Sequence, residues 1–168
     1  SEFIIRVFSI FIFPITLAVH PILINTWNKN KNIYEFFIKL FKASLIQVII
    51  FTIMIINLIV FKDFFFYIMQ LMVPELDNSM KDIMIPIFLG GFLWQLALVV
   101  HKPLEIEERT MIMVICILFS VVTNLIGNIL FLPKLGILAT AYTMIISALI
   151  YIISSILFSN SFRNIIKR

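Results

Sequence analysis

The stretch NLIGNILFLPKLGILATAYTMIIS, residues 124–147, joins two apolar segments that are each long enough to cross a membrane. These segments, 111–132 and 137–158, are separated only by residues 133–136. A hydrocarbon core about 30 Å thick is crossed by roughly 20 apolar residues in a helix. The stretch therefore predicts two consecutive transmembrane helices joined by a short connection.

The composition of the whole chain extends this prediction beyond the one hairpin. Of its 168 residues, 62% are hydrophobic and only 13% are charged, and the mean hydropathy is +1.11. A soluble domain of this size cannot bury so much apolar side chain, so the lipid bilayer must be its solvent. We therefore expect an all-α, polytopic integral membrane protein that forms a single membrane domain over residues 1–168.

Apolar runs of sufficient length place the expected spans. About five transmembrane helices are predicted, at about 3–24, 37–61, 83–101, 109–132 and 137–160. Segment 64–74 is also apolar, but it is too short to cross the bilayer. We interpret it as an interfacial or re-entrant turn whose aromatic side chains lie near the lipid headgroups.

The charged residues lie mostly between the predicted spans and divide unequally between the two sides. One side carries nine basic residues: Lys29, Lys31, Lys39, Lys42, Lys102, Arg109, Arg163, Lys167 and Arg168. The opposite side carries four: Arg6, Lys62, Lys81 and Lys134. Because basic connections stay on the cytoplasmic side, we expect a multi-pass protein of the inner (cytoplasmic) cell membrane with a cytoplasmic C-terminus. This placement explains the net charge of +4 without nucleic acid as a partner.

Two amides interrupt the apolar segment 111–132. Asn124 and Asn128 are four residues apart, which puts them on one face of a helix. Burying an amide in hydrocarbon is costly, so this face must turn toward protein, a cavity or a substrate. Small and hydroxyl residues share the face and recur at helical spacing in the next segment, a pattern that allows close helix packing. Both packing and cavity lining are compatible with the asparagines.

A second polar stripe runs along the first predicted span and includes Arg6, Thr16 and His20. Arg6 either extends to the headgroups or faces a cavity, where its planar fork suits a diphosphate. His20 is either hydrogen-bonded within the protein or takes part in proton coupling. Together with Asn124 and Asn128, these three residues are the candidates for lining a substrate cavity.

The spacing of Asn124, Asn128, Pro133 and Gly136 resembles the C-terminal half of polysaccharide and O-antigen flippases, in the multidrug/oligosaccharidyl-lipid/polysaccharide exporter superfamily. The chain departs from the family pattern at Ala139, Thr140 and Met144. The resemblance implies a bundle of a larger alternating-access transporter, in which an N-terminal half completes the cavity. It also implies a cargo of lipid-linked oligosaccharide, carried on a polyprenyl diphosphate for polysaccharide biosynthesis. A chain that begins at Ser1 fits the expectation of a fragment.

Sequence signatures of an enzyme are missing. There is no His/Glu pair at metal-ligand spacing, no glycine-rich phosphate loop and no pair of carboxylates inside a span, so we expect no metal, no cofactor and no catalytic residue. The acidic residues of the 101–110 connection, beside Lys102 and Arg109, suggest a solvated loop with local ion pairs. A membrane-embedded glycan polymerase or acyltransferase, or a multidrug exporter of the same superfamily, remain the alternatives.

Overall fold

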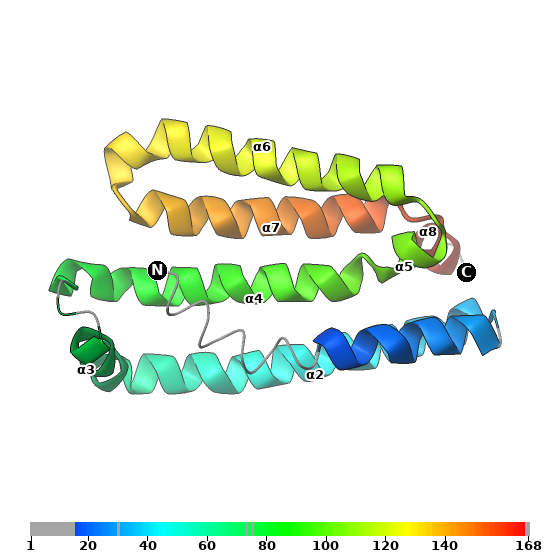
Figure 1. Cartoon of the computed structure of the whole chain (residues 1–168), viewed down its shortest axis with the longest axis horizontal. Coiled ribbons are helices and arrows are strands. Elements are labelled where there is room, and N and C mark those ends of the chain that lie inside the picture. Colours follow the sequence, from blue (N-terminus) through cyan, green and yellow to red (C-terminus); the bar gives the residue numbers. More distant parts are fainter. Residues whose placement is uncertain (1–15, 30, 73, 75, 167–168) are drawn as a thin grey trace.

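Four apolar runs form the long helices of the computed structural model, which describes residues 16–29, 31–72, 74 and 76–166 (Figure 1). These helices are α2 (Ile33–Val60), α4 (Met84–Val100), α6 (Thr110–Leu135) and α7 (Leu138–Phe158). A further helix occupies residues 16–29. No strand occurs among the described residues.

The long helices establish a multi-pass membrane protein. Four helices are long and apolar enough to cross a bilayer: Ile33–Val60, Met80–Ile106, Thr110–Leu135 and Leu138–Phe158. They correspond to four of the five expected spans. The remaining expected span, 3–24, lies largely outside the described residues.

The boundaries of two helices differ from those expected. Helix α2 begins at Ile33 rather than near residue 37, because the Asn32 side chain accepts hydrogen bonds from the backbone N–H groups of Tyr34 and Glu35. Helix α6 continues through Pro133 to Leu135, so most of the expected connection 133–136 is helical. Proline removes only one donor in this last turn, and Gly136, with a φ of 58°, ends the helix in a conformation that favours glycine.

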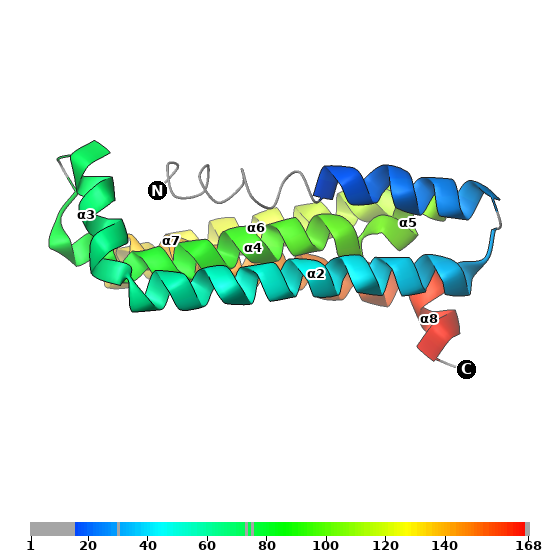
Figure 2. The same ribbon diagram turned by 90° about the horizontal axis from the view of Figure 1, so that it is seen from below.

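Short helices occupy the connections between the long ones. These are α3 (Lys62–Met72), the 3₁₀ helix η1 (Asn78–Ile83), α5 (Lys102–Ile106) and α8 (Asn160–Ile166). Helix α3 covers most of the segment for which we expected an interfacial or re-entrant turn, and it lies across one end of the bundle (Figure 2). Its Phe66 is buried in an apolar cluster with Phe51 of α2 and Phe88 of α4.

The long helices pack in the order α6, α7, α4, α2, so that each contacts its neighbour in this row (Figure 1). Aromatic stacking joins α2 to α4, where the ring centroids of Phe51 and Phe92 are 3.9 Å apart. Helix α6 lies at one end of this row, and large apolar side chains such as Leu125 and Ile129 are exposed on it. Such a surface is suited to solvation by lipid.

The connections gather at two ends of the bundle, which we name by the short helices found there (Figure 1). The α5 end holds α5, α8 and the connection between residue 29 and α2. The α3 end holds α3, η1 and the turn from α6 to α7. Seven of the nine basic residues expected on one side are described, and they lie at or toward the α5 end: Lys29, Lys31, Lys39, Lys42, Lys102, Arg109 and Arg163.

Candidate functional site

The two asparagines of α6 form one hydrogen-bonded network with α7. The Asn128 side chain donates to the Asn124 side-chain and backbone oxygens, at 3.0 and 2.9 Å. Its own oxygen accepts from Thr140 of α7 at 2.9 Å. Asn124 donates to the Ser147 hydroxyl at 3.5 Å. Both amides therefore face α7 and not lipid.

The polar face of α6 is also where α6 and α7 approach each other closely. The buried Ser120 hydroxyl donates to the Ser147 backbone carbonyl at 2.7 Å. A Cβ atom added at Gly127 would lie 2.5 Å from Cγ2 of Thr143, nearer than real Cβ atoms come to their neighbours. The prediction that small and hydroxyl residues pack these two helices together is confirmed.

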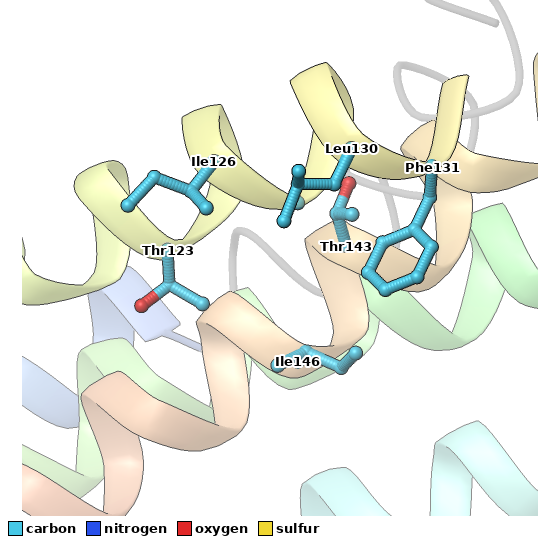
Figure 3. A pocket seen from close by; sticks show the side chains of 7 residues that line it. Thr123, Ile126, Leu130, Phe131, Thr143 and Ile146 are labelled. Carbon is cyan, nitrogen blue, oxygen red and sulfur yellow. The ribbon is translucent and has the colours of Figure 1, made fainter. Parts of the chain in front are cut away.

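A pocket of about 260 Å³ opens between α6 and α7 beside this network (Figure 3). It is lined mainly by apolar atoms, from Thr123, Ile126, Gly127, Leu130, Phe131, Thr143 and Ile146. Neither asparagine is among its lining residues. A cavity of this character suits a hydrocarbon chain better than a sugar, because it offers few groups to replace the hydrogen bonds of hydroxyls.

Thr16 belongs to a second polar contact, deep in the interface of three helices. Gln47 of α2 donates to the Thr16 hydroxyl at 3.0 Å, and this hydroxyl lies 3.4 Å from the side-chain oxygen of Gln95 in α4. Gln47 is fully buried. The contact therefore links the helix of residues 16–29 to both α2 and α4.

His20 belongs to a charged cluster at the α5 end. Lys102 Nζ donates to both carboxylate oxygens of Glu105, at 2.9 and 2.8 Å, and to His20 Nδ1 at 2.8 Å. His101 Nε2 lies 3.4 Å from the same carboxylate, and the Tyr151 hydroxyl lies 3.2 Å from His101 Nδ1. The cluster thus extends from α7, through the start of α5, to the helix of residues 16–29.

Burial in this cluster corrects one interpretation of the 101–110 connection. Local ion pairs are present, but the connection is not a solvated loop, since Lys102 is only 8% exposed and His101 only 6%. The sequence signal was available in part: His101, Lys102 and Glu105 have the three- and four-residue spacing of a helix face. Their burial depends on residues far along the chain, His20 and Tyr151, which cover them.

Glu107 anchors the C-terminal helix to the same connection. Its carboxylate accepts from the Ser159 hydroxyl at 2.6 Å and from the backbone N–H groups of Asn160 and Ser161, at 3.1 and 2.7 Å. Burial raises the pKa of Glu107, but these hydrogen bonds outweigh burial and hold the pKa below its ordinary value. Arg109 donates to the Phe158 carbonyl at the end of α7, at 2.6 Å. Both contacts satisfy groups left open at helix ends.

The candidate residues fall into two groups. Asn124 and Asn128 lie at the α6–α7 interface, whereas Thr16 and His20 lie where the helix of residues 16–29 meets α2, α4 and α5. Arg6 lies outside the described residues. Within the described part of the chain, His, Cys, Asp and Glu side chains form no group that could hold a metal ion.

Comparisons with protein-family models, with curated proteins and with solved structures find no match to this chain.

Proposed function

We propose that this chain is the C-terminal helix bundle of a transporter that moves lipid-linked oligosaccharide across the cell membrane. One observation carries the proposal: the run of Asn124, Asn128, Pro133 and Gly136, with its resemblance to polysaccharide flippases. The multi-pass helical architecture is compatible with this role. The α5 end, which gathers the basic residues, faces the cytoplasm in this proposal.

In this role the bundle works together with an N-terminal half, and the cargo lies in a cavity between the two. Hydrogen bonds between α6 and α7 support movement of this helix pair as one rigid body, which alternating access requires. Arg6 is the proposed contact for the cargo diphosphate, since a guanidinium can bind it with two parallel hydrogen bonds. The transport step makes and breaks no covalent bond, so the protein needs no catalytic residue or cofactor.

Flipping by the natural full-length protein is tested most directly in cells that lack it. Lipid-linked oligosaccharide should then accumulate in the cytoplasmic leaflet, out of reach of an impermeant glycan-modifying reagent. An unchanged distribution together with altered drug susceptibility would instead support a multidrug exporter. Intact flipping together with altered glycan chain length or acylation would support the membrane-enzyme alternative.

Arg6 variants test the proposed diphosphate contact in proteoliposomes. Arg6→Lys retains the charge but loses the bidentate fork, whereas Arg6→Ala loses both. Flipping should fall in the order wild type, Lys, Ala at equal protein content. Unchanged flipping in the Ala variant would leave Arg6 as a residue that only extends to the headgroups.

Leucine in place of Asn124 or Asn128 separates a packing role from cargo binding. Hydrogen bonds between membrane helices contribute about 0.6 kcal/mol on average and up to roughly 1.7 kcal/mol. We expect the larger loss of stability for Asn128→Leu, because the hydrogen bond that Asn128 accepts from Thr140 across the interface is 2.9 Å long, whereas Asn124 reaches Ser147 at 3.5 Å. Thermal unfolding in lipid nanodiscs and flipping per folded molecule are the measurements, with exposed Ile129→Leu as the control. Lost flipping at unchanged stability would assign the amides to the cargo path.

A further inference from the structure

We propose that His20 and Lys102 form a proton-sensitive latch that holds the helix of residues 16–29 against α5. Their contact is the 2.8 Å hydrogen bond from Lys102 Nζ to His20 Nδ1. The latch lies outside the α6–α7 interface and does not depend on what the protein transports.

The hydrogen-bond partners fix the proton positions in the closed latch. Lysine carries only donors, so His20 Nδ1 must be the unprotonated nitrogen of a neutral imidazole. Glu105 accepts from Lys102, and the neighbouring His101 Nε2 therefore carries a proton toward this carboxylate. The Tyr151 hydroxyl then donates to His101 Nδ1. Every group in the cluster has one consistent role, and the single positive charge is matched by a single negative charge.

Protonation of His20 disrupts both the donor and acceptor roles and the charge balance of the cluster. Its Nδ1 becomes a donor that carries positive charge, and it faces a second cationic donor at the distance of a hydrogen bond. A histidine is the side chain whose ordinary charge change falls between about pH 5 and pH 8. Acidification that protonates His20 therefore turns the contact from attractive to repulsive.

Burial decides which partner moves. The Lys102 side chain is 10% exposed and donates to both oxygens of Glu105, so it is held in place. The His20 side chain is 49% exposed and has an open path to water. Glu105 also lies 3.5 Å from His20 Nδ1, but it is already bound by Lys102 and cannot compensate two cations. His20 is therefore the side that leaves.

Apart from Lys102 and Glu105, no charged group within the described part of the chain is paired with His20. From α2, Lys39 and Glu35 face this helix six residues further on, where Lys39 bonds Thr26 and Glu35. From the C-terminal side, Arg109 and Arg163 bond carbonyls at the end of α7. Glu107 bonds α8.

One turn before His20, the same helix is fastened by groups that do not titrate. Thr16 contacts Gln47 and Gln95, and neither an alcohol nor an amide changes charge in the physiological range. Three residues after His20, Leu23 is buried in an apolar cluster with Leu40 and Val99. Opening of the latch therefore loosens the helix against α5, while the contacts on both sides of His20 keep it attached.

Spin-label distances in the natural full-length protein, in lipid nanodiscs, test the latch. Labels at Asn25→Cys, in the helix of residues 16–29, and at Thr110→Cys, four residues after the end of α5, report the separation of this helix from the α5 region, since both native side chains are exposed. Other cysteines are replaced, including the buried Cys116. We expect one short distance at about pH 8 and loss of that component, in favour of longer distances, at about pH 5.

Three variants make the result decisive. His20→Gln keeps a neutral acceptor and should retain the short distance at both pH values, whereas His20→Lys should lack it at both. His101→Gln, which can still donate to Glu105 and accept from Tyr151, should respond as the wild type does. A wild-type distance that is independent of pH would overturn the latch, as would a full response in His20→Gln or a lost response in His101→Gln. If His20→Lys fails to fold, the comparison of the wild type with His20→Gln still tests whether the change in distance depends on His20.

Discussion

The two ends of the bundle use the same kinds of charged residue in different settings. At the α3 end, Lys62 pairs with Asp82 and Lys81 with Asp63, and the two acidic side chains are 76% and 86% exposed. At the α5 end, Lys102 and His101 are buried beneath other helices, and Glu105 is largely covered. The two ends would look alike if only the number of ion pairs were compared. They differ in how deeply the charged side chains are buried.

This difference has an energetic meaning. An exposed ion pair contributes little to the stability of the fold, because water stabilises the separated charges almost as well as the ion pair does. A buried pair need not stabilise the fold, but removal of one partner leaves a charge without compensation. The α5 end is therefore sensitive to single substitutions, and the α3 end tolerates them.

Lys102→Met should produce the largest effect, because it leaves the Glu105 carboxylate without its main partner. Breaking a buried pair costs about 3–5 kcal/mol, and we expect about 3 kcal/mol here since Glu105 retains His101 and some access to water. Thermal unfolding in nanodiscs measures the loss. The double variant Lys102→Met/Glu105→Gln removes both charges and should recover part of the stability. A double variant less stable than Lys102→Met would contradict a charge-based explanation.

Glu107→Ala should have an intermediate effect, confined to α8. Loss of a side chain that caps a helix N-terminus costs about 0.5–2 kcal/mol. Hydrogen exchange at Asn160 and Ser161, whose N–H groups bond Glu107, is the direct measurement. Glu108→Ala is the matched control, because the neighbouring side chain is exposed. Equal exchange in the two variants would show that Glu107 does not hold the helix.

Acid should imitate the loss of Glu107. Its pKa is lowered in the folded protein, so its contribution to stability is fully present above the ordinary glutamate pKa of 4.5. That contribution disappears as the pH falls through the lowered folded pKa. Exchange at Asn160 and Ser161, corrected for the intrinsic pH dependence, should therefore rise only when the pH has fallen below the ordinary value of 4.5. Loss of protection at neutral pH would contradict the predicted pH dependence of the Glu107 contribution.

Lys62→Ala, at the α3 end, should have the smallest effect. Its partner Asp82 is well exposed, so the carboxylate that remains after the substitution stays solvated by water. The unfolding temperature should change far less than in Lys102→Met, and the small difference should shrink with added salt. A loss as large as that of Lys102→Met would remove the distinction between the ends.

The spans were predictable because length and apolar composition alone determine them in a bilayer. Helices α6 and α7 follow from the runs around residues 124–147, and the α7-facing side of α6 follows from the spacing of Asn124 and Asn128. The start of α2 was displaced because the cap at Asn32 lies before the apolar run. Local signals of this kind extend a helix beyond its hydrophobic segment.

The charged cluster was not predictable from its own segment. The residues His101, Lys102 and Glu105 look like an ordinary hydrophilic connection until the distant His20 and Tyr151 are placed beside them. Pairing over such sequence separations is a property of the tertiary arrangement. Of this cluster, only His20 was a candidate from the sequence.

The hydrogen bond from Thr140 to Asn128 also bears on how the protein enters the membrane. An amide-bearing segment is a poor candidate for insertion alone, since each unpaired amide must be desolvated in hydrocarbon. Thr140 lies only twelve residues after Asn128, across the turn at Gly136, so its hydroxyl becomes available as soon as α7 begins to form. During synthesis, α6 should therefore remain in the translocation channel until α7 has begun to form. The two helices should then enter the lipid as a pair.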